Sequence, residues 1–245
     1  MPHRFYLPQL AAAPPHRLEA AEAHHLAHVL RLDVGDTIEV FDGQGRAAPA
    51  VVEACSKREV CLRLGAVRCD PPPPFPLVVA TAIPKGARCD WLVEKLAELG
   101  AARWVPLNTT RGVVQPREHK LDRLRQLVVS ACKQSGRNWL MDIAPLTDWD
   151  QFLHREVASV GGFLVDPSGQ PWTEVIQPPP QSDAATLFAI GPEGGWTREE
   201  IKAAVGRGMH TVTLGARILR VETAALAVAA TWSTTVAAVS RPPSA

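Results

Sequence analysis

The stretch AIGPEGGWT, residues 189–197, joins an apolar segment to a helix-like one. Its three glycines tolerate positive φ and let a ligand approach the bare backbone, whose amide groups can bind the ligand's polar edge. Thr197 and Glu200 have the spacing of a capping box, which predicts that a helix begins here. A plain strand-to-helix turn is the alternative interpretation. A plain turn would need only one or two glycines and this one has three, so we favour a turn that binds a ligand.

A second turn of this kind lies in LGARILRVETA, residues 214–224, again between a strand-like and a helix-like segment. Glu222 lies near the expected helix start, where the helix dipole favours an acidic residue. A structural ion pair between Arg220 and Glu222 and a catalytic role for them are both compatible with these residue types. Both turns follow predicted parallel strands, and open α/β sheets bind ligands at that edge.

The residues around the two turns alternate between strand-like and helix-like periods, which predicts a parallel sheet covered by helices. The strands are expected at 77–83, 103–107, 162–166, 186–190 and 211–214. The helices are expected at 89–99, 118–134, 198–207 and 222–239. Residues 167–183, with three consecutive prolines, are expected to form an irregular loop.

A proline run at residues 71–76, PPPPFP, forms an extended and stiff connector. We therefore expect a first domain at 1–70 and a second at 77–245. In the first domain, strands are expected at 37–41, 50–54 and 59–64 in a small β-barrel, and a helix at 22–32.

Histidines and cysteines are the candidate metal ligands. His24 and His28 form an i, i+4 pair, but no third ligand is evident, so a surface cluster is favoured over a metal site. The five cysteines form no C-x-x-C pair, which argues against a disulfide framework and a zinc cluster. We expect reduced thiols and no metal.

The composition, 46% hydrophobic and 21% charged, predicts soluble domains with real cores. The Ala-rich stretch 223–239 contains Ser and Thr and is expected to be a buried helix and not a membrane span. The first residues lack a signal peptide, so a cytoplasmic location is expected.

Residues 85–137 contain eleven Lys or Arg and five Asp or Glu. This excess is typical of a surface that binds a phosphate backbone, although a solvated helix face explains it equally well.

The two C-terminal motifs, IGPEGG at 190–195 and LGxRILRxETA at 214–224, resemble the signature of the RsmE family, within the SPOUT methyltransferases. Residues 28–31 and 41–43 are similar to the family's N-terminal RNA-binding barrel, which is PUA-like. Residues 85–86, 98–100 and 134–137 match further family positions. Lys133 departs from the family, which often has an acidic residue there, and this weakens any proposal for a carboxylate base at that position.

The resemblance implies a SPOUT-type parallel sheet with a C-terminal trefoil knot, preceded by a PUA-like barrel. It implies a homodimer that transfers a methyl group from S-adenosylmethionine to the N3 atom of a uridine in small-subunit ribosomal RNA, free or in the assembled subunit. The cofactor-binding residues it implies are Ile190, Gly191, Pro192, Glu193, Gly194, Gly195, Leu214, Gly215, Ile218, Leu219, Thr223 and Ala224.

A uridine N3 carries a proton, so the site needs a base and a cation that stabilises the resulting anion. We expect Arg220 and Arg137 to contact the uracil or its phosphate, and Glu222 to orient an arginine or assist proton removal. The residues expected to contact the RNA backbone are Arg4, Arg31, Lys85, Arg88, Arg111, Arg117, Lys120, Arg123 and Arg137.

Three other functions stay open. One is methylation of another ribosomal or transfer RNA nucleotide by the same fold. A non-catalytic RNA-binding protein would keep the barrel and the basic face without binding the cofactor. A nicotinamide-dependent oxidoreductase fits the α/β alternation, but the chain lacks the G-x-G-x-x-G spacing of a dinucleotide site.

Overall fold

The computed structural model describes residues 2–56, 59–114, 118–157, 161–175 and 184–239. The chain divides into two compact units. The first comprises Met1–Pro72 and Val129–Leu140, and the second comprises Pro73–Val128 and Met141–Ala245. The first unit therefore includes a segment from far along the sequence, which no local pattern indicates.

The first unit is built on a mostly antiparallel sheet in the order β1-β3-β4-β5-β2, with β6 paired to β4. Its strands are β1 (Arg4–Tyr6), β2 (His16–Glu19), β3 (Thr37–Phe41), β4 (Arg46–Cys55), β5 (Glu59–Leu64) and β6 (Arg68–Cys69). The strands expected at 37–41 and 59–64 are confirmed, and the one expected at 50–54 begins earlier, at Arg46. Alternate residues such as Ile38 and Val40 point into the core, as a half-buried strand requires.

The helix expected at 22–32 is wrong in its extent and type. The chain forms a short α1 (Ala20–His24) that continues as a π-helical turn, η1 (His25–Val29). Arg31 has φ 55°, a left-handed conformation that a helix cannot continue through, so the helical segment ends before it. The His24 and His28 rings lie 4.8 Å apart, and no metal-binding group of three His, Cys, Asp or Glu is found among the described residues.

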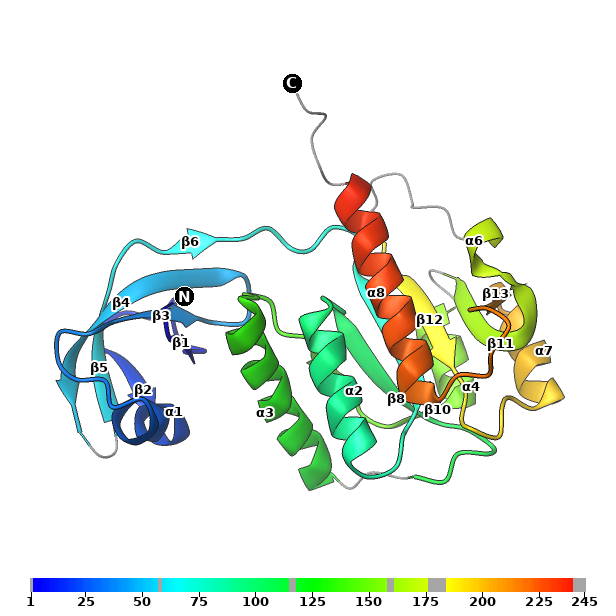
Figure 1. Cartoon of the computed structure of the whole chain (residues 1–245), viewed down its shortest axis with the longest axis horizontal. Helices are drawn as coiled ribbons and strands as arrows, with labels where there is room; N and C mark the ends of the chain where they lie inside the picture. Colours follow the sequence, from blue (N-terminus) through cyan, green and yellow to red (C-terminus); the bar gives the residue numbers. More distant parts are fainter. Residues whose placement is uncertain (1, 57–58, 115–117, 158–160, 176–183, 240–245) are drawn as a thin grey trace. The chain divides into compact units, whose positions relative to one another are not determined.

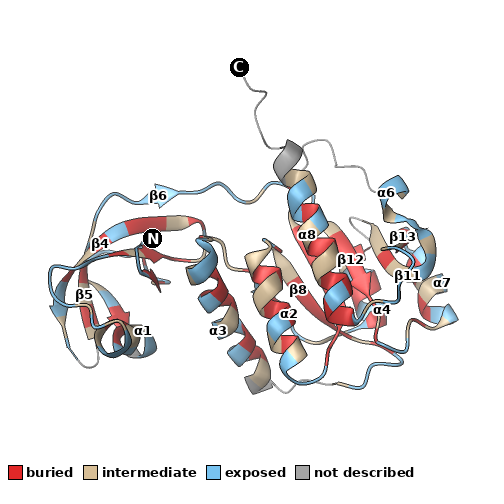
Figure 2. Ribbon diagram, in the orientation of Figure 1, coloured by how far each residue is buried: buried red, intermediate tan, exposed pale blue. Residues whose placement is uncertain are grey.

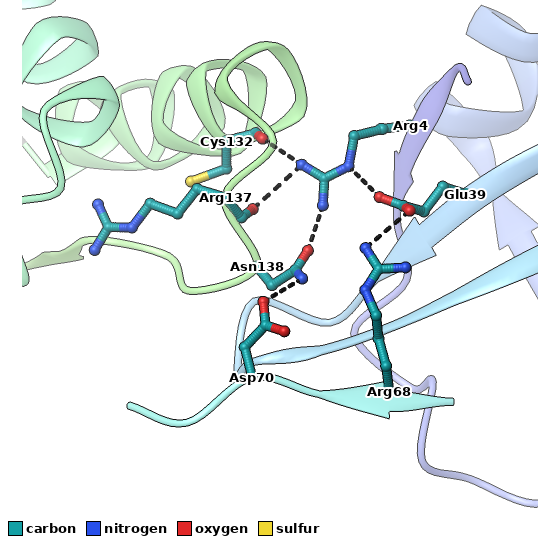
Figure 3. Close-up of polar contacts among 7 residues, drawn as sticks. All are labelled: Arg4, Glu39, Arg68, Asp70, Cys132, Arg137 and Asn138. Atoms are coloured by element: carbon teal, nitrogen blue, oxygen red, sulfur yellow. Dashed lines mark hydrogen bonds and ion pairs between the residues drawn. The ribbon is translucent and has the colours of Figure 1, made fainter. Parts of the chain in front are cut away.

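Arg4 ties the segment after residue 129 into the first unit (Figure 3). Its guanidinium donates hydrogen bonds to Glu39, to the carbonyl oxygens of Cys132 and Arg137, and to the side chain of Asn138. Asn138 in turn donates to Asp70, 2.7 Å away. Because Arg4 is buried and so fully engaged, the structure gives it a structural role, and we no longer expect it to contact RNA phosphates.

The second unit is built on a parallel sheet in the order β10-β8-β7-β12-β11-β13, with β9 paired to β8. Its strands are β7 (Leu77–Ala82), β8 (Arg103–Asn108), β9 (Asp142–Ile143), β10 (Thr147–Asp148), β11 (Gly162–Pro171), β12 (Thr186–Ile190) and β13 (Met209–Thr213). Every residue of β7 is buried, as expected for a central strand covered on both faces (Figure 2).

Helices cover this sheet on both faces (Figure 1). They are α2 (Ala87–Glu98), α4 (Trp149–Phe152) continuing as η2 (Leu153–Val157), α6 (Trp172–Val175), α7 (Arg198–Val205) and α8 (Val221–Val239). A further helix, α3 (Glu118–Ser135), belongs to the second unit up to Val128 and to the first unit from Val129 on. Helices α2 and α8 pack side by side, and α8 packs against β7 and β12. Trp149 and Phe152 of α4 belong to the core of the opposite face, together with Leu187 of β12. The expected α/β alternation is confirmed.

Part of the loop expected at 167–183 is regular structure. Strand β11 continues to Pro171, because after an irregularity at 166–169 Gln170 pairs again with Val212 of β13. A single turn of helix, α6, follows, and residues 176–183 lie outside the described residues. In the part of the chain that the structure describes, no helix is both long and apolar enough to cross a membrane.

Candidate functional site

The carboxyl ends of β12 and β13 and the irregular part of β11 at 165–167 meet at a cavity, called here the strand-end cavity. Its empty volume is about 630 Å³, which includes open space at its mouth and lies in the range of small-molecule sites. The segment 214–219 and the first turn of α8 complete its wall. The lining residues are Val165, Asp166, Pro167, Ile190, Gly191, Pro192, Glu193, Gly195, Trp196, Thr213, Leu214, Arg217, Ile218, Leu219, Val221 and Ala224.

The turn at 191–196, called here the glycine turn, is held at both ends. Thr197 and Glu200 form the predicted capping box, so α7 begins directly after the turn. The Trp196 indole packs against Gly191, where an added Cβ would lie 2.9 Å from the ring. Gly195 has φ 69°, and its N–H donates to the carbonyl of Pro192, 2.8 Å away. The glycines are therefore needed for both the close packing and the backbone path.

The second turn, at 214–220, leaves its residues largely exposed. Gly215 has φ 128°, and its carbonyl accepts a hydrogen bond from the Thr213 hydroxyl. Ile218 lines the strand-end cavity but remains 89% exposed. An apolar side chain so exposed beside a cavity is available to cover a bound molecule.

The structure brings most of the expected cofactor-binding residues to one place. The ones that line the strand-end cavity are Ile190, Gly191, Pro192, Glu193, Gly195, Leu214, Ile218, Leu219 and Ala224. Gly194, Gly215 and Thr223 do not line it. Gly194 faces the side chain of Arg111 instead, and Gly215 lines a neighbouring hollow beside Trp172.

Sequence reasoning missed the third wall of the cavity, which Val165, Asp166 and Pro167 provide from the irregular part of β11. It also missed Trp196, a residue within the quoted motif. A signal for the third wall was present, because Asp166 ends a strand that was predicted for the same parallel sheet. What the sequence could not show is that β11 lies between β12 and β13, which places residues 165–167 against both turns.

Comparison with known proteins gives this site a context. The RNA methyltransferase domain family matches residues 71–233, and the RNA methyltransferase PUA domain family matches residues 18–65. A Synechocystis protein named ribosomal RNA small subunit methyltransferase E is 34% identical over 88% of this chain and 74% of its own length.

Solved structures agree with this match. The ribosomal RNA small subunit methyltransferase E of Neisseria gonorrhoeae, bound to S-adenosyl methionine, is 32% identical, with a TM-score of 0.86 over 96% of this chain and 97% of that one. A Legionella pneumophila methyltransferase with bound SAM is 29% identical, with a TM-score of 0.84 over 96% of this chain and 98% of that one. The chain belongs to the RsmE family of RNA methyltransferases.

In this RsmE-family chain, neither Arg220 nor Glu222 lines the strand-end cavity, although both flank residues that do. Arg220 is exposed immediately before α8. Glu222 is only 5% exposed, and its carboxylate lies 3.5 Å from the guanidinium of Arg88 on α2. The structure therefore pairs Glu222 with Arg88, and it shows no Arg220–Glu222 ion pair. Within the described part of the chain, one Glu222 oxygen is buried without a hydrogen-bond partner.

Arg137, the third expected catalytic residue, belongs to the first unit. Its carbonyl accepts a hydrogen bond from Arg4, and its side chain extends away from Arg4 (Figure 3). Burial lowers the pKa of Arg137, but a guanidinium stays protonated at any physiological pH. Arg137 is therefore a partly buried cation whose backbone is fixed.

The RsmE-family sheet carries several of the expected RNA-binding cations at the edge that holds the cavity, since each follows the carboxyl end of a strand. These are Lys85 and Arg88 after β7 and Arg111 after β8. Arg220, expected to contact the uracil or its phosphate, follows β13, as does Arg217, for which no RNA contact was expected. Lys120 and Arg123 lie on α3, where Arg123 pairs with Asp90 of α2. Arg31 is exposed in the first unit, and Arg117 lies outside the described residues.

Proposed function

We propose that this chain transfers a methyl group from S-adenosylmethionine to the N3 atom of a uridine in small-subunit ribosomal RNA. The observation that carries the proposal is the strand-end cavity, formed by both signature motifs in a chain similar to a SAM-bound small-subunit methyltransferase. The same reasoning locates the protein where small subunits are assembled, in the cytoplasm.

The residues of the strand-end cavity fit the cofactor by their chemistry. Ile190, Leu219 and Ala224 offer apolar surface suited to an adenine ring, and the exposed backbone of the glycine turn offers hydrogen bonds to its edge. Asp166 and Glu193 provide carboxylates that favour a cationic, hydroxyl-bearing ligand. When bound, S-adenosylmethionine supplies an activated methyl group on a sulfonium.

The uridine sets the remaining demands, because its N3–H must lose a proton before or during methyl transfer. The anion that forms spreads over the two adjacent carbonyl oxygens, and a cation aimed at them lowers the barrier. Arg220 is exposed beside the cavity wall and is our choice for this contact. Glu222 orients Arg88 or assists proton removal. Arg137 remains a candidate for contact with the uracil or its phosphate.

The RNA itself would bind through phosphate contacts at the cation-bearing edge of the sheet, with the target base turned out of its stack. Lys85, Arg88 and Arg217 are exposed or half-buried there. Such contacts release counterions, so affinity should fall steeply as salt rises. A flat salt dependence would remove these residues from the interface.

We also propose that the chain acts as a homodimer and that its C-terminal region is knotted, as the family resemblance implies. Sedimentation at micromolar concentration tests the first point, since a monomer would sediment with the mass of one 26.5 kDa chain. Tracing the chain in an experimental density map tests the second.

The proposal is tested by offering the purified chain labelled S-adenosylmethionine with assembled small subunits, deproteinised ribosomal RNA or transfer RNA. We expect label at N3 of one uridine in ribosomal RNA, identified by mass spectrometry of the digested nucleosides. Label in transfer RNA, or at another atom, would contradict the substrate assignment. Tight RNA binding without measurable cofactor binding would contradict the enzyme assignment.

A further inference from the structure

Arg111 contacts the glycine turn directly. It follows β8, and its Nη1 atom donates to the carbonyl of Gly194 at 2.7 Å and to that of Trp196 at 3.4 Å. The stem of the side chain lies over Gly194, where an added Cβ would be 3.3 Å from Arg111 Cδ. One side chain from the segment after β8 thus contacts the turn at two of its carbonyl groups.

The residue before it makes a second connection. The backbone N–H of Thr110 donates to Glu200 Oε1 at 2.9 Å. The other carboxylate oxygen of Glu200 accepts from the Thr197 N–H at 2.8 Å, which closes the capping box. Glu200 is only 5% exposed, so these bonds are shielded from water. The segment after β8 is therefore tied both to the glycine turn and to the helix that follows it.

A glycine-rich turn needs such ties, because glycine loses more conformational freedom on ordering than any other residue. Gly191 and Gly195 line the strand-end cavity, so the conformation of the turn decides the shape of the cavity. Holding the turn before a ligand arrives reduces the entropy lost on binding.

We propose that Arg111 is a positioning residue for the cofactor: it holds the glycine turn in its binding conformation, and it does not serve mainly as a phosphate contact. This inference rests on the proposed function of the cavity. It replaces the expectation that Arg111 is one more cation on the RNA-binding edge.

Three substitutions separate the two roles. Arg111→Ala removes both the hydrogen bonds and the charge; Arg111→Gln keeps a donor without charge; Arg111→Lys keeps charge and donor. A positioning role predicts that Ala weakens S-adenosylmethionine binding about tenfold, because a charge-assisted hydrogen bond is lost. Gln and Lys should each restore part of that affinity, because each keeps a hydrogen-bond donor. A phosphate contact predicts a different result. Arg111→Ala would then weaken RNA affinity, and only Lys would restore it.

The matched control is Lys85→Ala, which removes a cation from the same edge of the sheet. We expect it to weaken RNA binding and to leave cofactor affinity unchanged, measured by calorimetry and by filter binding. If Arg111→Ala shows that same pattern, the positioning role is refuted. Should the Ala variant not fold, the comparison of Gln with Lys decides between the roles.

Amide hydrogen exchange of residues 191–197 provides a readout that needs neither cofactor nor RNA. In the ligand-free protein we expect faster exchange in Arg111→Ala and an intermediate rate in Arg111→Gln. Unchanged exchange would overturn the inference even if the chain proves to be a methyltransferase. If the unaltered chain binds no cofactor, the proposed function fails, whereas the exchange rates still show whether Arg111 holds the turn.

Discussion

The indole nitrogen of Trp196 donates a hydrogen bond to the carbonyl of Val165, 3.1 Å away. This bond joins the end of the glycine turn to β11 at Val165, where the irregularity of that strand begins, so two walls of the strand-end cavity are fixed to each other. The same indole packs against Trp149 in a tilted arrangement, with ring centroids 4.5 Å apart. The cavity is thus shaped by an aromatic side chain that directly follows the signature motif at 190–195 and belongs to the core.

Replacing Trp196 with Phe should separate these walls. We expect a loss of about 1 kcal/mol in the free energy of unfolding, the net value of one hydrogen bond, and a clear drop in cofactor affinity. Trp104→Phe is the control, because its buried indole N–H donates to Thr81 Oγ1 away from the cavity. Equal losses of cofactor affinity in both variants would show that the Trp196–Val165 bond has no special role.

Alanine at Gly191 should be much worse than alanine at Gly194. An added Cβ at Gly191 would lie 2.9 Å from the buried, rigid ring of Trp196, and overpacking of this kind costs about 1–3 kcal/mol. At Gly194 the nearest atom, 3.3 Å away, belongs to the flexible stem of Arg111. Thermal unfolding and cofactor titration of both variants provide the measurement, and a reversed order would contradict the described packing.

Removing Arg220 should affect turnover more than binding. If Arg220 stabilises the anion that forms on the uracil, Arg220→Ala lowers kcat by about 10²–10³ and leaves the Kd for S-adenosylmethionine nearly unchanged. The control is Arg207→Ala, which removes an exposed arginine just before β13, at the opposite edge of the sheet. Unchanged turnover in Arg220→Ala would remove this residue from the mechanism.

Acid should weaken the first unit through Glu39. Burial alone would raise the pKa of Glu39, but hydrogen bonds from Arg68 and Arg4, and their charges, hold it below its ordinary value of 4.5. Because the unfolded chain takes up this proton first, the stabilisation is present above pH 4.5. It is lost as the pH falls through the lower folded-state pKa.

Glu39→Gln should therefore flatten the loss of stability between pH 7 and strongly acidic conditions. Urea unfolding at several pH values measures this, with fluorescence of the first unit's Trp139 as one signal. Glu53→Gln is the control, since Glu53 forms an exposed ion pair with Arg63. A pH dependence unchanged from that of the unaltered chain would show that the Arg4–Glu39 contact contributes little.

The sequence by itself determined the alternation of strands and helices, the two glycine turns and the capped start of α7. Each is a local property: side-chain period, glycine content and the spacing of Thr197 and Glu200 act within a few residues. For this reason the bounds of β3 and β5 agree with the prediction residue by residue. The resemblance of the two motifs to a known family supplied the chemistry that these patterns alone do not specify.

Only the tertiary structure decided which residues meet. It placed β11 between β12 and β13, which brings Asp166 to the cavity. It paired Glu222 with Arg88, whereas the sequence suggested Arg220 as the partner of Glu222. It also buried Arg4 against residues more than a hundred positions away. Strand order and long-range pairing depend on packing between distant segments, which no local period or spacing encodes. An arginine is therefore a buried structural residue at position 4 and an exposed residue at position 220.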